Sequence, residues 1–188
     1  MVNKLLEGKN VNLRLMEKED ADFILECLNN IDYYEYDPIT QVSKTELVKG
    51  YDNPSQLAVA TERQNFIIEK KDGTKVGFIR HGLILPHRLL EIGYVIVPSE
   101  RGKGYATEAA QLVVDYLFLS KDICRIEAGT NVRNKASQKV LEKVGFKREG
   151  TLRKVMFARG EWVDVYIFSI LREEWKEPKI LTKTVRQK

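Results

Sequence analysis

The sequence predicts a single α+β domain in which a mixed, mostly antiparallel sheet is flanked by helices. The chain has 188 residues, a length that suits one domain of ~100–200 residues. Helical and strand periodicities alternate along it, so helices and strands are expected to share one core. Three strand-like runs between residues 64 and 97 are separated by short turn signals, which indicates an antiparallel meander.

Before the meander, the chain predicts one strand and two or three helices. Apolar and polar residues alternate over Asn10–Met16, which is typical of a strand, and an apolar stripe over Glu19–Asn30 predicts a helix. Ser43 and Glu46 have capping-box spacing, so another helix is expected to begin there and to be interrupted by Pro54. A second short helix is expected to carry two apolar residues further on, Leu57 and Val59.

The meander itself is expected to hold three strands. The first contains Phe66–Ile68 and runs into the hairpin signal Lys71-Asp72-Gly73. The return strand is expected over Val76–Leu85, and a turn at Pro86-His87-Arg88 leads into the third strand, Leu89–Val97. The apolar character of this third strand indicates burial on both faces.

The remaining elements alternate between helix and strand. A helix is expected over Gly104–Ser120, where apolar residues recur at steps of three and four, and a strand over Ile123–Thr130. The next helix, Asn134–Val144, ends at Gly145, a residue suited to the left-handed position after a helix. Two final strands are expected over Lys147–Phe157 and Trp162–Leu171.

The domain is expected to cover residues 1–177. From Pro178 to Lys188 the chain is polar and basic, so this segment is expected to form a frayed C-terminal tail. No internal repeat and no low-complexity segment divides the rest of the chain.

Composition excludes several classes of protein. The 31 Lys and Arg against 27 Asp and Glu leave a net charge of +4, spread along the chain, which does not favour nucleic-acid binding. Two cysteines and two histidines without ligand spacing predict neither a disulfide framework nor a metal site. Glu7 interrupts any N-terminal signal peptide, and no apolar run approaches the ~18 residues of a membrane span. A cytoplasmic protein without membrane contact is expected.

A glycine-rich turn between a buried strand and a helix predicts an anion site. Arg101-Gly102-Lys103-Gly104 offers flexible backbone, two cations and the N-terminus of the following helix, a combination suited to a pyrophosphate. A Walker A loop is absent, and a dinucleotide fingerprint would need glycine where Thr107 stands. A plain surface turn would leave the glycines and cations unexplained.

Four segments resemble the GNAT N-acetyltransferase superfamily. Arg101-Gly102-Lys103-Gly104-Tyr105-Ala106 is similar to its Arg/Gln-x-x-Gly-x-Gly/Ala signature. Asn131-Val132-Arg133-Asn134-Lys135-Ala136-Ser137 and Glu142-Lys143-Val144-Gly145-Phe146 resemble the segments around its next helix. The stretch Gly160–Leu171 resembles the RimJ/RimL-like branch, which acetylates N-termini of ribosomal proteins. The resemblance covers about residues 8–176.

The resemblance implies an acyl-CoA N-acyltransferase fold of the α/β/α sandwich type that binds acetyl-CoA and acetylates an amine. In this family two neighbouring strands, here 89–97 and 123–130, splay apart to admit the pantetheine arm. The amides of Val95 and Val97 would bind that arm, and one nearby amide would polarise the thioester carbonyl. For Asn131 and Asn134, contact with the arm or the phosphates and helix capping both remain open. The implied cosubstrate site is Val95, Ile96, Val97, Arg101, Gly102, Lys103, Gly104, Tyr105, Ala106, Thr107, Asn131 and Asn134.

The reaction also needs proton transfers. An alkylammonium with a pKa of about 10 must lose a proton before it attacks, so a general base is required. Glu91, where several family members place a glutamate, is the first candidate, and Asp164 is the second. A tyrosine that often serves as the acid is replaced by Leu141, so Ser137 is expected to assist the leaving thiolate, although Met156 replaces a glutamate of the RimL-like mechanism.

The acceptor and the assembly are less closely defined. The segment after the first helix shapes the acceptor site in this superfamily, and its acidic and aromatic residues would suit a cationic amine: Tyr33, Tyr34, Glu35, Tyr36 and Asp37. A protein N-terminus and a small amine are both expected acceptors, and a homodimer is expected. The alternative is a non-catalytic module that binds acyl-CoA without turnover.

Overall fold

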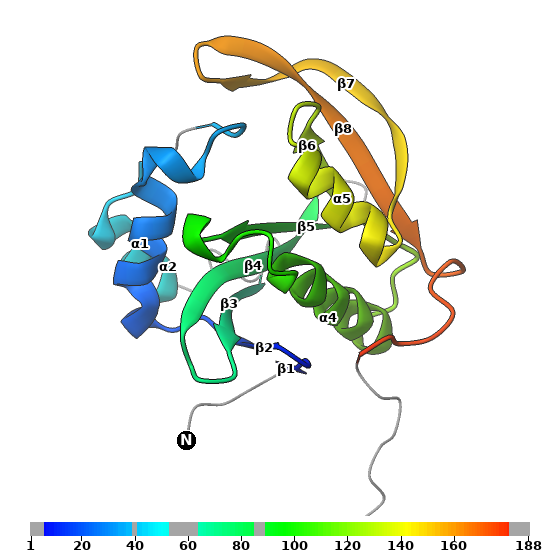
Figure 1. The fold of residues 1–188 in the computed structure, drawn as a ribbon, viewed down its shortest axis with the longest axis horizontal. Helices are drawn as coiled ribbons and strands as arrows, with labels where there is room; N and C mark the ends of the chain where they lie inside the picture. Colours follow the sequence, from blue (N-terminus) through cyan, green and yellow to red (C-terminus); the bar gives the residue numbers. More distant parts are fainter. Residues whose placement is uncertain (1–5, 39–40, 53–63, 85–88, 181–188) are drawn as a thin grey trace, which may run out of the picture.

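The protein, described by a computed structural model over residues 6–38, 41–52, 64–84 and 89–180, is built on one sheet (Figure 1). Among these residues the sheet has eight strands in the order β1-β2-β3-β4-β5-β6-β8-β7. The strands are β1 (Leu6–Glu7), β2 (Val11–Leu15), β3 (Gln64–Lys70), β4 (Lys75–Ile84), β5 (Leu89–Ile96), β6 (Arg125–Asn131), β7 (Lys147–Ala158) and β8 (Glu161–Leu171).

Strand pairing confirms the mixed, mostly antiparallel sheet. The meander β3-β4-β5 is antiparallel throughout, with Ile79 of β4 opposite Phe66 on one side and Tyr94 on the other. The pair β5–β6 is parallel, and the remaining neighbours are antiparallel. The two-residue strand β1 was not predicted because so short a segment carries no periodicity.

Helices cover both faces of the sheet, which makes three layers. On one face α1 (Ala21–Asn29) and α2 (Lys44–Asp52) lie against Ile67 and Phe78. On the other face α4 (Tyr105–Ser120) and α5 (Lys135–Val144) close the larger core. Figure 1 shows the two helix layers on opposite sides, with the β7–β8 hairpin extending past them. The described residues also form three short 3-10 helices: Lys18–Asp20, Ile31–Tyr33 and Pro98–Glu100.

Helix ends follow the predicted local chemistry. The amide of Ser43 donates to Glu46 Oε2 at 3.0 Å and the Glu46 amide donates to Ser43 Oγ at 3.2 Å, so the capping box is formed. Gly145 ends α5 with φ 116°, in the left-handed region where glycine is favoured. The expected helix at Leu57 and Val59, the break at Pro54 and the turn at 86–88 lie outside the described residues.

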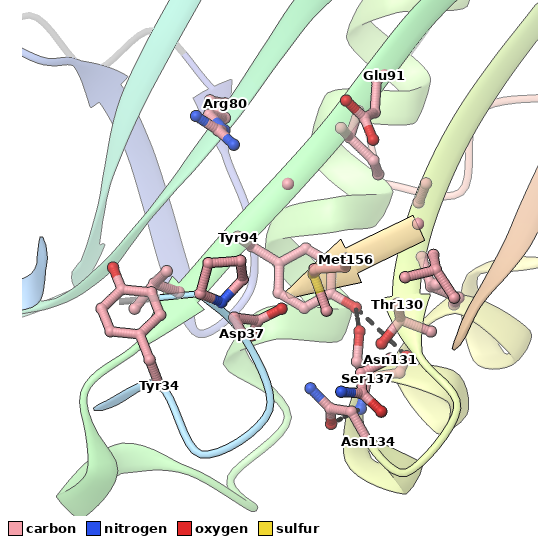
Figure 2. Close-up of a pocket in the computed structure, with 18 of the residues that line it drawn as sticks. Tyr34, Asp37, Arg80, Glu91, Tyr94, Thr130, Asn131, Asn134, Ser137 and Met156 are labelled. Carbon is pink, nitrogen blue, oxygen red and sulfur yellow. Dashed lines mark hydrogen bonds between the residues drawn. The ribbon is translucent and has the colours of Figure 1, made fainter. Parts of the chain in front are cut away.

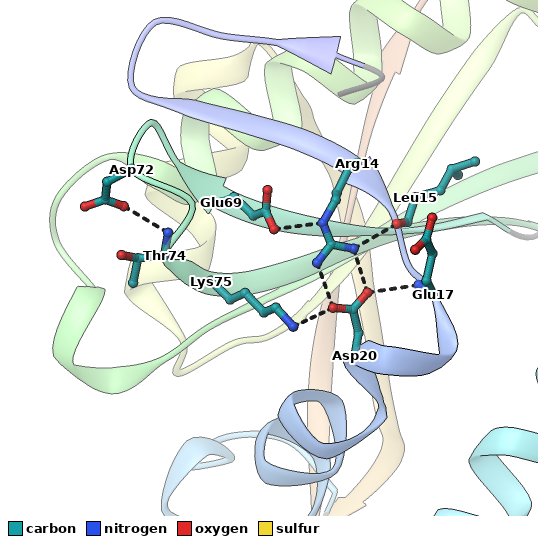
Figure 3. Close-up of polar contacts among 8 residues, drawn as sticks. All are labelled: Arg14, Leu15, Glu17, Asp20, Glu69, Asp72, Thr74 and Lys75. Carbon is teal, nitrogen blue, oxygen red and sulfur yellow. Dashed lines mark hydrogen bonds and ion pairs between the residues drawn. The ribbon is translucent and has the colours of Figure 1, made fainter. Parts of the chain in front are cut away.

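A buried ionic cluster joins β2, β3 and β4 to the start of α1 (Figure 3). The guanidinium of Arg14 donates to Asp20 through two nitrogens, at 2.6 and 2.7 Å, and to Glu69 at 2.7 Å. Lys75 also donates to Asp20, at 2.6 Å. Burial favours a protonated Asp20, but these hydrogen bonds hold the pKa of its carboxyl well below its usual range.

The chain after β8 is tied to α4. Buried Asp115 accepts hydrogen bonds from Trp175 Nε1 at 2.9 Å, from the Lys179 amide at 3.0 Å and from the Ile180 amide at 2.9 Å. The folded part therefore continues to Ile180, beyond the boundary expected after residue 177. The rest of the expected tail, residues 181–188, lies outside the described residues.

Candidate active site

The central feature of the site is the separation of β5 from β6. These parallel strands pair only at Leu90 with Ile126 and at Glu91 with Glu127, although both strands continue. A cavity of about 690 Å³ opens where the pairing stops. This observation confirms the divergence of the two strands that the family resemblance implied.

The cavity has two ends, one on each face of the sheet. Alternate residues of a strand point to opposite faces. Tyr94 of β5 therefore faces the α4–α5 layer, together with Asn134 and Ser137 from α5 and the turn before it. Arg80 of β4 points to the same face as Phe78, toward the α1–α2 layer, where the loop after α1 adds its own side chains (Figure 2).

The glycine-rich turn forms an open anion cradle at the start of α4. Gly102 and Gly104 have φ values of 77° and 88°, which side-chain-bearing residues rarely adopt. Within the described part of the chain, the amides of Gly102–Thr107 donate to no protein acceptor, while the next amide, that of Glu108, bonds the Gly104 carbonyl at 3.1 Å. Six adjacent donors at a helix N-terminus suit a diphosphate.

The two cations of this turn have partners of their own. Arg101 Nε donates to the Ile96 carbonyl at 3.1 Å and Nη2 donates to the Tyr33 carbonyl at 2.8 Å. Lys103 is paired with Glu100 at 2.9 Å. Arg101 thus ties the loop after α1 to the end of β5, and the cradle consists mainly of backbone amides.

The backbone of β5 offers different groups to the cavity from those the resemblance implied. The Val97 amide donates to the Val76 carbonyl of the neighbouring chain segment at 2.9 Å. Hydrogen-bonding direction alternates along an antiparallel strand, so Val95 also faces β4. The peptide groups of Tyr94 and Ile96 face the opening instead, and these are available to a bound arm.

The two asparagines line the cavity and both have structural roles. Asn134 Oδ1 accepts the Ser137 amide at 3.0 Å, which is the capping interaction expected as one of its two roles. Buried Asn131 donates to the Tyr36 carbonyl at 2.8 Å and accepts the Arg133 amide at 2.9 Å. Asn131 therefore holds the loop after α1 from the β6 side.

A hydroxyl pair lies in the cavity between β5 and α5. Tyr94 Oη is 3.0 Å from Ser137 Oγ (Figure 2). Burial raises the pKa of Tyr94 to about 12, so its hydroxyl keeps its proton at neutral pH. Sequence reasoning found Ser137 and missed Tyr94, which reads as an ordinary apolar position of a buried strand.

The other predicted catalytic residues have distinct positions. Glu91 lines the cavity as an exposed side chain at the last β5–β6 pair, and Figure 2 shows it at the opposite end of the view from Ser137. Leu141 and Met156 also line the cavity. Asp164 instead accepts the Lys154 amide at 2.9 Å, where β7 departs from regular pairing.

Three residues of the loop after α1 line the cavity, Tyr34, Asp37 and Pro38. Beside the contacts of Arg101 and Asn131, Arg159 of the β7–β8 turn donates to the Tyr34 carbonyl at 3.3 Å and the Ile31 carbonyl at 2.9 Å. Three distant segments thus fix this loop across the cavity. Such long-range contacts explain why sequence reasoning could place the loop only in general terms.

The described residues contain no group of three or more His, Cys, Asp and Glu side chains arranged to hold a metal ion. In the same part of the chain, no helix combines the length and apolar character needed to cross a membrane.

Comparison with known proteins agrees with this geometry. Residues 10–147 match the family described as acetyltransferase (GNAT) domain. A protein named as an uncharacterized N-acetyltransferase of Bacillus licheniformis is 33% identical over 174 residues, covering 90% of this chain and 97% of its own. The match spans nearly the whole of both chains.

Solved structures show the same fold. A spermidine N-acetyltransferase from Vibrio cholerae, in complex with CoA and spermine, has a TM-score of 0.78 and 25% identity, covering 88% of this chain and 98% of its own. Mycobacterium smegmatis RimJ with CoA-disulfide has a TM-score of 0.74 and 27% identity, covering 89% and 85%. The fold and the divided sheet define an acetyltransferase. The chain belongs to the GNAT family of N-acetyltransferases.

Proposed function

We propose that acetyl-CoA binds in this cavity, with its diphosphate on the amides of Gly102–Thr107 and its pantetheine arm between β5 and β6. The observation that carries the proposal is the end of β5–β6 pairing after Glu91 and Glu127, which leaves strand-edge peptide groups facing a cavity of about 690 Å³. The free amides at the start of α4 supply the complementary anion site. CoA in the two solved relatives supports this assignment.

The proposed reaction is direct transfer to a primary amine. The ammonium loses a proton, the nitrogen lone pair forms a bond to the acetyl carbonyl carbon, and the carbon–sulfur bond breaks. The nitrogen loses a second proton as the amide forms, the thiolate receives a proton, and the amide product keeps the acetyl group. A peptide N–H facing the opening, from Tyr94 or Ile96, would stabilise the negative charge that develops on the carbonyl oxygen.

Three groups are proposed to transfer protons. Glu91 is proposed to receive the proton of the ammonium, with a water molecule as relay, from its exposed position at the cavity rim. Ser137 is proposed to assist the leaving thiolate. The hydroxyl of Tyr94, 3.0 Å from Ser137 Oγ, would replenish the proton that Ser137 gives up.

The acceptor is proposed to be a primary amine, on a small molecule or at a protein N-terminus. Relatives with each type of name support it: spermidine N(1)-acetyltransferase of Escherichia coli, 29% identical, and the putative ribosomal N-acetyltransferase YdaF of Bacillus subtilis, 34% identical over 109 residues. Cytoplasmic location and a homodimer remain predictions from the sequence.

The test combines binding with turnover. Calorimetric titration is expected to show acetyl-CoA binding, and a thiol assay is expected to show CoA release that depends on an added amine. Glu91→Gln is expected to keep acetyl-CoA affinity and to lower kcat by about 100-fold, in the range that general-base catalysis supplies. Binding without amine-dependent release from any acceptor would instead support the non-catalytic acyl-CoA module.

A further inference from the structure

Three polar side chains on the α1–α2 side of the cavity make no hydrogen bond or ion pair within the described part of the chain. They are the carboxylate of Asp37, the hydroxyl of Tyr34 and the guanidinium of Arg80, and all three line the cavity (Figure 2). The buried charges of the cluster around Arg14, by contrast, are paired with one another. Asp37 is half-buried and Arg80 is exposed, so both charges are open to a ligand that enters the cavity.

Asp37 is a carboxylate in a partly buried position. Burial raises the pKa of its carboxyl, and the positive charge of Arg101 acts in the opposite direction. That guanidinium does not pair with Asp37, because it donates to the carbonyls of Ile96 and Tyr33. A half-buried anion without a hydrogen-bond donor is stabilised by a cationic ligand, and an ammonium supplies both the charge and the donors.

Tyr34 lies three positions before Asp37 in the chain, and it is 8% exposed. Its buried hydroxyl has no hydrogen-bond partner. Burial raises the pKa of Tyr34 to about 12, with Asp37 acting in the same direction and Arg80 in the opposite one. The hydroxyl therefore keeps its proton at neutral pH, and Tyr34 contributes a neutral, buried wall to this end of the cavity.

Arg80 extends from β4 on the exposed rim of the same end. Its neighbour across the sheet is Gly93, whose position leaves room for the guanidinium: a Cβ there would lie 3.4 Å from Arg80 Nε. If the ammonium of an acceptor contacts Asp37, the rest of the acceptor lies near the positive charge of Arg80. A second ammonium would be repelled, whereas a carboxylate or phosphate would be bound by the guanidinium.

We infer that the acceptor carries an anionic group in addition to its amine, with the ammonium on Asp37 and the anion on Arg80. This inference rests on the proposed function and defines its substrate class: an amino acid-like or phosphate-bearing amine rather than a polyamine. Asp37 lines the same cavity as Tyr94 and Ser137, so an ammonium bound there would share that cavity with the hydroxyl pair.

The test compares acceptors of matched chain length. Alkyl monoamines, diamines and amino carboxylates at several chain lengths, with aminoethyl phosphate against ethylamine, are assayed with acetyl-CoA by CoA release. The amino carboxylate or amino phosphate is expected to have a kcat/KM about tenfold or more above its matched monoamine and diamine, as an added charge-assisted hydrogen bond supplies. Which of the two anions is preferred distinguishes a carboxylate-bearing from a phosphate-bearing acceptor.

Three substitutions separate the roles of the charges. Arg80→Gln is expected to remove the preference, so that kcat/KM for the amino carboxylate or amino phosphate falls to that of its matched monoamine, and Arg80→Glu is expected to transfer the preference to the diamine. Asp37→Asn is expected to raise KM for every acceptor by about tenfold, while the Kd of acetyl-CoA stays constant. Thermal unfolding checks that each variant is folded.

The outcomes distinguish the inference from the function on which it rests. If the diamine is the best acceptor of the wild-type protein, or Arg80→Gln leaves the ratio unchanged, the inference is wrong and the acetyltransferase stands. If acetyl-CoA binds but no amine releases CoA, the proposed function fails and the inference fails with it.

Discussion

Two charged regions of this protein have similar residues and opposite states of pairing. Around Arg14, two carboxylates and two cations are joined by short hydrogen bonds (Figure 3). On the α1–α2 side of the cavity, Asp37 and Arg80 make no hydrogen bond or ion pair with the described part of the chain (Figure 2). Charge and residue type therefore do not identify a functional site in this fold.

The difference lies in what completes each group. Asp20 is 1% exposed and receives donors from Arg14, Lys75 and a backbone amide, so the fold itself satisfies it. Asp37 receives no donor from the described chain and lines the cavity, so its carboxylate is open to a ligand. The cluster around Asp20 holds β2, β3 and β4 together. Asp37 instead leaves an unpaired charge at the place where an amine is proposed to bind.

The largest expected effect comes from breaking the paired cluster. Asp20→Asn leaves Arg14 and Lys75 with a buried positive charge that has lost its main counter-ion, and we expect a loss of about 3–5 kcal/mol of unfolding free energy. Urea denaturation measures it. An unfolding free energy equal to that of the wild-type protein would show that the cluster does not stabilise the fold.

The same cluster predicts how stability depends on acid. The pKa of Asp20 is lowered in the folded protein, so its stabilising effect is complete above its unfolded value, about pH 4. Stability is lost as pH falls below that value toward the folded pKa. Unfolding measured from neutral pH into this acid range is expected to show a steeper loss for the wild-type protein than for Asp20→Asn; parallel curves would contradict the assignment.

The third effect concerns the cosubstrate end of the cavity. Gly104→Val is expected to weaken acetyl-CoA binding by at least about 100-fold, close to 3 kcal/mol, because a branched side chain would keep a diphosphate away from the amides. Gly73→Val is the matched control, since both glycines have φ 88° and open space around them. Equal losses of affinity in the two variants would mean that backbone strain, and not the cradle, is responsible.

The smallest expected effect tests the loop that presents Asp37. Arg159 has φ 53° and donates to two carbonyls of that loop, so Arg159→Gly removes a strain of about 1 kcal/mol together with the contacts. Acceptor KM is expected to rise a few-fold, with little change in Tm. Lys154→Gly, at φ 50°, removes similar strain without touching the loop and is expected to leave KM unchanged; a similar rise in both would contradict the loop's role.

The elements of the fold could be predicted because periodicity and capping are local. The capping box of Ser43 and Glu46 and the terminal Gly145 can each be recognised from a few neighbouring residues, and both are present in the structure as expected. The glycine-rich turn was likewise recognisable as the start of a helix, and its function as an anion site stays a prediction. Strand β1 and the anchoring of Ile180 on Asp115 depend on tertiary contacts, and they could not be predicted.

The sequence named candidate residues of the site but not their hydrogen-bond partners. Ser137 was expected, but its partner Tyr94 lies 43 positions earlier in the chain and meets it only in the folded protein. Arg101 was expected to face an anion, yet it donates to a carbonyl 68 positions away. Arg80 has the pattern of an ordinary outward-facing strand residue, and only the register of β4 with β5 brings it to the cavity.

The most direct test of the comparison is a paired measurement on Asp37→Asn: its Tm at neutral pH and its kcat/KM for amine-dependent CoA release. Because burial raises the pKa of Asp37, the folded state disfavours the charged carboxylate, and removing that charge stabilises the fold. We predict a Tm equal to the wild-type value or up to about 2 °C higher, as functional sites commonly trade stability for activity, with kcat/KM reduced about tenfold. A lower Tm with unchanged kcat/KM would show instead that Asp37 is a structural residue like Asp20.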